Sequence, residues 1–367
     1  MKLNPLHNQV GGHDGVLSMG EDNEIIVKPS LPQELAFYEE SVLHPELAAW
    51  MPAYYGSLTL TRDPAAIAAM TATNEDGAVN SEGAVAAAIK AFNGYPVGDF
   101  LPLNTFDQAN PDKDPEVPLP VEKGEFDDEC ICLENVSHGF TKACVLDLKL
   151  GTQLFDDNAS EEKKARLGAV SDNTTSGKLG IRLTGFHVYD GEKEEFVKYS
   201  KQHGKSLTEA TILEGFRSFF AAKLGPQRMR LVVERFVNDL TDFLATIQEE
   251  ELRMRSSSLL MMYEGDVEAF DKGVLEEQGN IAKVVERAQA HLERQDDDDE
   301  EDEDEDEDDE DFEDEEVKQK VTDMRLIDFA HSTWTPGMGP DEGVVLGVKS
   351  TLSLFEQLLV TDYPEDE

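Results

Sequence analysis

Short apolar runs bounded by glycine and polar residues dominate the first half of the chain, whereas longer runs with apolar residues every three or four positions dominate the second half. The first pattern is typical of strands and the second of helices. We expect strands at 24–29, 130–136, 143–151, 179–189 and 324–330, and helices at 31–50, 207–224, 227–252, 267–294 and 343–360. Because the strands and helices do not alternate, the sequence predicts an α+β fold.

Two segments follow neither pattern. Residues 63–125 pass from an alanine-rich stretch to one dense in proline, aspartate and glycine, and we expect an irregular surface insert there. Residues 296–316 are acidic at every position except Phe312. Like charges repel and bury nothing, so we expect a disordered insert. Whether it is a solubilising loop or a docking site for basic partners stays open.

Charge narrows the classes of partner. The 367 residues include 78 Asp and Glu against 32 Lys and Arg, which gives a net charge of −46. This balance excludes non-specific binding of nucleic acid to a basic surface and favours basic proteins as partners. Hydrophobic residues make up 39% of the chain, enough for a buried core.

Cysteine usage and hydropathy indicate a compartment. Three cysteines, Cys130, Cys132 and Cys144, form no disulfide framework, and we interpret them as buried thiols rather than zinc ligands. The amino terminus has no signal-peptide pattern, and we expect no membrane span. These features predict a soluble, intracellular protein.

The strongest local signal is Asp147-Leu148-Lys149-Leu150-Gly151. Alternate side chains of a strand share a face, so the leucines should point into the core while Asp147 and Lys149 face outward together. Such a pair beside a glycine suits a cleft that handles a charged substrate. An exposed ion pair on an amphipathic strand is the alternative.

A second signal is Asp328, at the end of an apolar strand. Such a carboxylate can hold Mg²⁺ against nucleotide phosphates, or it can cap a turn. Lys28 on an early strand and Glu34 on the next helix precede it, in the order found in kinase-like phosphotransferases. Residues 203–206 fail as a P-loop, and no H-R-D-x-x-x-x-N segment occurs, which disfavours a conventional protein kinase.

The segment 142–182 is an exception to the acidic balance, with seven basic residues against six acidic ones. Ser160 is typical of a helix N-cap, and Lys163 and Arg166 would share one face of the helix that follows. That face is either a solvated surface or, beside Asp147 and Lys149, a cradle for phosphates.

Six short segments stand in a fixed order along the chain. They are Q-V-G-G-H at 9–13, A-C-V-L-D-L-K-L-G at 143–151, G-K-S-L-T at 204–208, S-S-L-L with Y-E-G at 257–265, I-D-F-A-H at 327–331, and D-E-G with G-V-K-S at 341–350. Together they resemble the motif set of the inositol polyphosphate kinase family. The short spacing over 152–178 resembles the arrangement of either the multikinases or the hexakisphosphate kinases, and the I-D-F-A-H segment favours the multikinases, in particular the fungal ones.

The resemblance implies a two-lobed fold with a protein-kinase-like ATP-grasping core and a short inositol-binding helical segment. The N-terminal lobe would span 1–136 with the insert at 63–125. The C-terminal lobe would span 137–367, with the inositol-binding segment at about 152–178 and the acidic insert at 296–316.

The resemblance also implies ATP and Mg²⁺ as cofactors. Lys28 would contact the ATP phosphates with Glu34 as its partner, and the backbone of Glu134 and Val136 would bind adenine. Asp147 would bind ribose or assist proton removal, two roles that stay open. Lys149 would lie between the attacking hydroxyl and the γ-phosphate, and Asp328 would hold Mg²⁺. The implied contacts to inositol phosphate are Lys149, Lys163, Lys164, Arg166, Gln202 and His331.

The implied activity is phosphorylation of inositol tris- and tetrakisphosphates towards the pentakisphosphate, by a monomer in nucleus and cytoplasm that also contributes to transcriptional regulation. The alternative is a non-catalytic acidic scaffold for basic transcription or chromatin proteins. Two positions depart from the family's pattern. Ala143 replaces the signature proline, and Gly168 and Ala169 stand where fungal relatives can carry basic residues.

Overall fold

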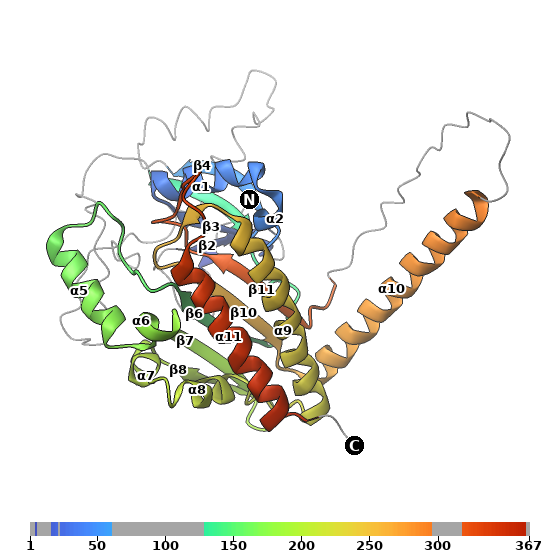
Figure 1. Ribbon diagram of the computed structural model, residues 1–367. Coiled ribbons are helices and arrows are strands. Elements are labelled where there is room, and N and C mark those ends of the chain that lie inside the picture. Colours follow the sequence, from blue (N-terminus) through green and yellow to red (C-terminus); the bar gives the residue numbers. More distant parts are fainter. Residues whose placement is uncertain (1–3, 6–15, 21–22, 61–127, 296–317, 365–367) are drawn as a thin grey trace, which may run out of the picture.

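The computed structural model describes residues 4–5, 16–20, 23–60, 128–295 and 318–364 (Figure 1). The expected inserts at 63–125 and 296–316 and the Q-V-G-G-H segment lie outside the described residues. Two antiparallel sheets form the core of two lobes, and the longest described helices lie in the C-terminal part of the chain. The predicted α+β fold is confirmed.

The sheet of the N-terminal lobe has the order β1-β2-β3-β5-β4. Its strands are β1 (Asn4–Pro5), β2 (Leu17–Met19), β3 (Ile25–Pro29), β4 (Tyr54–Leu60) and β5 (Asp128–Glu134). The expected strand at 24–29 is β3, and the one at 130–136 is β5, two residues earlier. β4, at the edge of the sheet, carried no strand signal that we recognised.

The expected helix at 31–50 is broken into three pieces, α1 (Pro32–Glu40), the 3₁₀ turn η1 (Ser41–Leu43) and α2 (Pro45–Ala48). The break falls at His44, whose φ of −126° and ψ of 62° are not helical. Pro45 follows, and proline disfavours the helical conformation in the residue before it. A proline is well tolerated at the first position of a new helix, where α2 has it.

The sheet of the C-terminal lobe has the order β11-β10-β6-β7-β8. Its strands are β6 (Ala143–Leu150), β7 (Ile181–Asp190), β8 (Glu195–Tyr199), β10 (Ser258–Glu264) and β11 (Thr322–Ile327). A two-stranded ribbon of β9 (Leu252–Arg253) and β12 (Thr333–Trp334) lies apart from it. β6 is therefore a central strand flanked by β10 and β7.

The C-terminal lobe also contains helices. They are α5 (Glu161–Asp172), α6 (Thr175–Leu179), α7 (Lys201–Ser206), α8 (Ile212–Phe219), α9 (Pro226–Glu249), α10 (Val267–Gln295) and α11 (Glu342–Thr361). Figure 1 shows α9 and α11 side by side across the sheet, while α10 extends away from the body and α5 lies at the opposite edge. Leu146, Leu148 and Leu150 point into the core beneath α9 and α11, as predicted.

By length and composition alone, α11 could cross a membrane. Its buried side chains include Val344, Val348 and Phe355, which pack in the same core as Leu146 and Leu150 of β6. A core helix passes the same test of length and composition, and α11 is a core helix in this fold.

The Y-E-G and G-K-S-L-T segments have structural roles. The Glu264 carboxylate is fully buried and accepts hydrogen bonds from the backbone amides of Thr141 and Lys142, at 2.7 and 2.9 Å. A side chain at Gly204 would meet the Leu183 carbonyl, so this glycine lets α7 approach β7 closely.

Candidate active site

Lys28, Glu34 and Asp328 meet where the two lobes face each other. The Nζ atom of Lys28 on β3 lies 2.7 Å from a Glu34 oxygen and 3.4 Å from an Asp328 oxygen. Burial opposes the charge of Lys28, but the carboxylates of Glu34 and Asp328 outweigh it and raise its pKa. Lys28 is therefore held in its charged form.

Lys149 joins this group from β6. Its Nζ atom donates to the other oxygen of Asp328 at 2.7 Å and to the backbone carbonyl of Ser256 at 2.8 Å. The Asp328 carboxylate thus lies between two ammonium groups, one from each lobe. Lys28, Lys149 and Asp328 are hereafter called the lysine–aspartate bridge.

Asp328 has an unusual backbone. It follows β11 with φ of 68°, in the left-handed region that costs a non-glycine residue about 1 kcal/mol. The next residue, Phe329, is fully buried against Phe37 and Tyr38 of α1. The packing of Phe329 holds the turn, and the turn aims the Asp328 carboxylate at the two lysines.

The expectation that Asp147 and Lys149 face outward is wrong, because their side chains are buried, with exposures of 3% and 8%. The alternative of an exposed ion pair is also wrong. The Asp147 carboxylate accepts a hydrogen bond from the Thr184 hydroxyl at 3.2 Å, while Lys149 pairs with Asp328. Thr184 is the additional residue where the β6–β7 register shifts, and bulges of this kind often re-aim side chains beside active sites.

An apolar cluster lies on the same sheet face as Asp147. Val136, Val145 and Met262 are buried together, with Leu260 packed against them. Leu260 is opposite Asp147 in the strand register. The cluster could accept an apolar ring next to a carboxylate, which is the combination a nucleoside needs.

Glu134 and Val136 lie where β5 leaves the N-terminal lobe. The Glu134 amide donates to the Ala53 carbonyl at 2.9 Å, and its carboxylate lies 3.5 Å from Lys320. Lys320 also donates to the Val136 carbonyl at 3.2 Å. The side chain of Glu134 thus belongs to an ion-pair network, and only its backbone could serve a nucleotide.

The basic helix forms as predicted. Ser160 caps α5, accepting a hydrogen bond from the Lys163 amide at 3.2 Å. Asp156 then bridges two predicted substrate contacts, since its Oδ2 atom lies 3.8 Å from Lys163 Nζ and 3.4 Å from His331 Nδ1. The half-buried Arg166 is one turn further along α5. α5 is thereby joined to the segment that carries Asp328.

Two predicted substrate contacts are not joined to this group. Lys164 pairs with the exposed Glu161 at 3.1 Å, and Gln202 is exposed on α7, which packs against β7. Within the described ranges, no hydrogen bond or ion pair links either side chain to the lysine–aspartate bridge.

Sequence reasoning missed Arg182 and Ser256 as candidate site residues. Arg182 is buried on β7 and is opposite Lys149 in the register, which adds a second cation to this face. The only feature of the sequence that pointed to Arg182 was its place among the basic residues of 142–182. Ser256, with φ of 60°, contributes through its backbone carbonyl, for which side-chain patterns give no signal.

A pre-built metal cluster does not occur in the part of the chain that the structure describes, where no three His, Cys, Asp or Glu side chains gather. A Mg²⁺ ion that arrives with nucleotide phosphates needs only one or two carboxylates from the protein. Asp328, held between two lysines that would favour phosphate, fits that requirement.

Comparisons with known proteins bear on the family and the fold of the chain. Residues 130–356 match the family model described as inositol polyphosphate kinase. The chain is similar to the inositol polyphosphate multikinases of Saccharomyces cerevisiae, at 34% identity over 95% of this chain and 97% of the relative, and of Schizosaccharomyces pombe, at 28% identity over 98% and 99%. The crystal structure of inositol phosphate multikinase Ipk2 from S. cerevisiae, in complex with ADP and Mn²⁺, is similar with a TM-score of 0.56 and 27% identity, over 92% of this chain and 99% of that chain.

Proposed function

Because the chain belongs to the inositol polyphosphate kinase family, we propose that it transfers the γ-phosphoryl group of ATP to ring hydroxyls of inositol phosphates. The observation that carries this proposal is the lysine–aspartate bridge, in which the ammonium groups of the half-buried Lys28 and the buried Lys149 flank one carboxylate. Phosphoryl transfer needs fixed cations and a metal-holding carboxylate more than it needs a covalent nucleophile.

The nucleotide would enter between the lobes. Adenine would pack on the apolar cluster of Val136, Val145 and Met262, next to the backbone of Glu134 and Val136. Asp147 lies beside that cluster, which favours contact with the ribose over proton removal. Lys28 would bind the phosphates, and Glu34 holds its ammonium group in place.

Asp328 would hold Mg²⁺, which would neutralise charge on the transferred group when bound. Lys149 would exchange its bond to Asp328 for the γ-phosphate while keeping its bond to the Ser256 carbonyl. A bond forms between the substrate hydroxyl oxygen and the γ-phosphorus, and the bond to the β,γ-bridging oxygen breaks. The hydroxyl proton is released and ADP leaves.

The acceptor would lie against α5. Three cations can face several phosphates at once: Lys163 and Arg166 on that helix and the buried Arg182. His331 would add a ring nitrogen, and Lys164 and Gln202 would contribute from further away. Bidentate guanidinium contacts suit phosphate groups in particular. We propose inositol tris- and tetrakisphosphates as substrates and the pentakisphosphate as product.

The test is incubation of the full chain with Mg-ATP and a panel of inositol phosphates, with product isomers resolved by anion-exchange chromatography. We expect phosphate to be added to tris- and tetrakisphosphates. A chain that binds ATP but phosphorylates no member of the panel contradicts the proposal.

The acidic run at 296–316 favours a second candidate function. We propose that this run attracts basic transcription or chromatin proteins, and that the protein is a monomer in nucleus and cytoplasm. Binding of such partners would either accompany the kinase activity or be the main role of a non-catalytic scaffold. Deleting 296–316 should then spare kinase activity and weaken salt-sensitive binding of a basic partner such as a histone. Unchanged binding would reduce the run to a spacer.

A further inference from the structure

Four rings stack in one continuous column at the boundary of the two lobes. The centroids of Phe329 and Phe37 are 4.6 Å apart at 16°, and those of Phe37 and Trp334 are 4.7 Å apart at 3°. Trp334 in turn stacks on His44 at 3.7 Å and 9°. These four residues are called the aromatic column.

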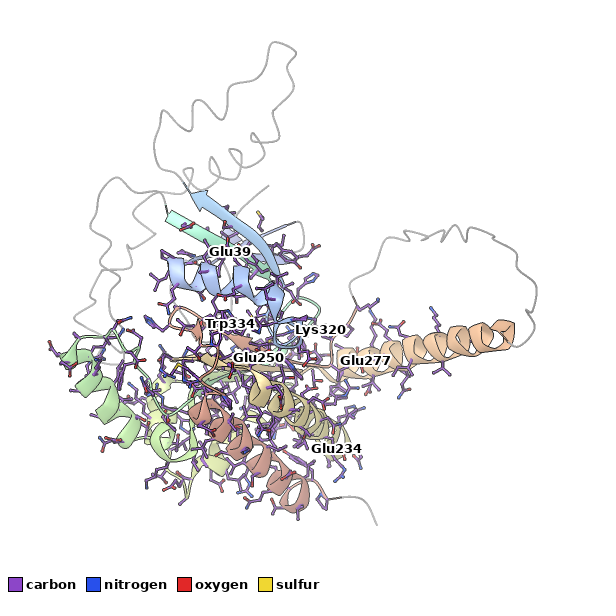
Figure 2. All side chains as sticks on the ribbon, turned by 45° about the horizontal axis from the view of Figure 1, so that its top comes forward. Glu39, Glu234, Glu250, Glu277, Lys320 and Trp334 are labelled. Carbon is purple, nitrogen blue, oxygen red and sulfur yellow. The ribbon has the colours of Figure 1, made fainter. Side chains whose placement is uncertain are left out.

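The column alternates between lobes. Phe37 is on α1 and His44 precedes α2, whereas Phe329 and Trp334 follow β11 in the C-terminal lobe. Beyond His44, its Nδ1 atom lies 2.8 Å from the carboxylate of Glu250, which follows α9. Figure 2 labels Trp334 and Glu250, which lie close together below α1. Each lobe thus inserts rings between those of the other.

One end of the column adjoins both carboxylate partners of Lys28. Phe329 follows Asp328 directly, and Phe37 is three residues after Glu34 on α1, so that the two share a helix face. A shift of Phe37 moves Glu34, and a shift of Phe329 moves Asp328. The rings therefore fix the distance between two carboxylates that belong to different lobes.

At Trp334 the side chain is held by packing, while its backbone pairs with β9. The indole Nε1 atom of Trp334 is buried, with no hydrogen-bond partner among the described residues. Protein interiors are close-packed, and paired aromatic rings keep their centroids about 4.5–7 Å apart. The spacing of the column is thus set by contact between ring faces.

We propose that Trp334 and Phe37 are positioning residues for phosphoryl transfer, because the aromatic column holds Asp328 and Glu34 at their required distance from Lys28. This inference rests on the proposed kinase function. A displacement of about 1 Å at a reacting group can reduce rate by about 100-fold, so loss of a ring from the column should reduce turnover more than substrate binding.

The chain offers a matched control, since Trp50 is the only other tryptophan in the sequence. Trp50 packs edge to face on Phe243 and donates to Thr246 at 3.3 Å, outside the column. Trp334→Leu should lower kcat about 10- to 100-fold with an unchanged KM for the inositol phosphate. Trp334→Phe, which keeps a stacked ring, should stay within about threefold of the parent. Trp50→Leu should reduce stability without that loss of kcat.

A kcat for Trp334→Leu equal to that of Trp50→Leu, with both fully folded by circular dichroism, overturns the proposal. A Trp334→Phe variant as impaired as Trp334→Leu does so too, because stacking would then not be the operative feature. If neither a wild-type nor a control chain phosphorylates any inositol phosphate, the kinase assignment fails instead.

A spectroscopic readout serves even where Trp334→Leu does not fold. In the Trp50→Phe chain, excited where tyrosine does not absorb, the tryptophan emission comes from Trp334 alone. Mg-ADP, which would engage Lys28 and Asp328, should shift that emission through the column, and Phe37→Leu should reduce the shift. Emission that stays constant while calorimetry records Mg-ADP binding overturns the coupling independently of turnover.

Discussion

The lysine–aspartate bridge and the basic face of α5 are built in opposite ways. Lys28 and Asp328 are 300 positions apart and Lys149 and Asp328 are 179 apart, and all three are largely buried. On α5, the paired acids are local, since Asp156 lies just before the helix and Glu161 is three residues from Lys164. One region is fixed by the whole fold, whereas the other is set by a short stretch of sequence.

This difference separates the residues proposed for phosphoryl transfer, in the lysine–aspartate bridge, from those proposed to select the inositol phosphate, on α5. Removing one member of a largely buried set of compensating charges lowers stability, because the charge that remains is left without its partner. The ion pairs on α5 are local, and screening by water and salt is greatest at Lys164, whose partner Glu161 is 91% exposed. We therefore infer that the nucleotide end of the site is rigid and that the inositol end can change by substitution without loss of the fold.

The largest effect is expected at the bridge. Lys149→Ala and Asp328→Ala should each lower turnover by about 1,000-fold or more, because each removes charge placed for the transition state. Asp147→Ala should also remove turnover. Circular dichroism should show an intact fold in all three. Lys178→Ala, at an exposed lysine paired with Glu209, is the control. Near-normal turnover in Lys149→Ala or Asp147→Ala would reject the site assignment.

A second comparison contrasts two ion pairs. Arg255 Nη1 lies 2.6 Å from Asp341, with side-chain exposures of 10% and 9%, and the same carboxylate caps α11. Arg255→Met leaves that carboxylate buried without its partner and should lower the free energy of unfolding by about 3 kcal/mol. Arg217→Met, which breaks an exposed pair with Asp362, should cost about 1 kcal/mol or less. Urea denaturation measures both, and equal losses would contradict the buried-versus-exposed distinction.

On α5, substitutions should change affinity alone. Lys163→Ala or Arg166→Ala removes one phosphate contact, worth about 1.5 kcal/mol, and should raise KM for the inositol phosphate about 10-fold. KM for ATP should not change. Steady-state kinetics with each substrate varied in turn provides the measurement, with Glu162→Gln on the same helix as control. A rise in KM for ATP instead would place α5 at the nucleotide.

The smallest effect concerns pH. Burial, with the charges of Asp323 and Asp242, raises the pKa of Asp239 from 3.8 to about 6. A carboxyl group with a higher pKa in the folded state binds its proton more tightly there, so its stabilising contribution is lost as pH rises from about 4 to 6.

Asp239→Asn should remove this pH dependence and raise the free energy of unfolding at pH 7 by about 1 kcal/mol, a value reduced for partial exposure. Urea unfolding across pH 4.5 to 7 tests this, with Glu249→Gln on α9 as control. A parallel pH dependence in Asp239→Asn would show that another group titrates.

Sequence patterns predicted the strands that carry the site but not what covers them. The period of two placed Leu146 and Leu148 in the core correctly, and the shared face of Asp147 and Lys149 was also correct. The prediction that this face is exposed was wrong. Residues far away in sequence bury it, namely Val136, Leu260 and the turn at Asp328.

Other misses have equally specific causes. The helix expected at 31–50 breaks where Pro45 constrains His44, a boundary that the apolar spacing hid. Ser256 acts through a carbonyl, and the aromatic column depends on the relative placement of two lobes. Local periodicity contains neither kind of information. Gln202, predicted from the resemblance alone, stays a prediction.

The 300-residue separation of Lys28 and Asp328 has a consequence for biosynthesis. At about 5 to 20 residues per second, a ribosome needs roughly 15 to 60 seconds between the two. Throughout that interval Lys28 can pair with Glu34 but not with Asp328, which has not yet been made. β11, the edge strand that ends before Asp328, has not yet been added to its sheet either. A nascent chain interrupted before β11 is therefore inert, and catalytic competence arises only after β11 and Asp328 have been translated.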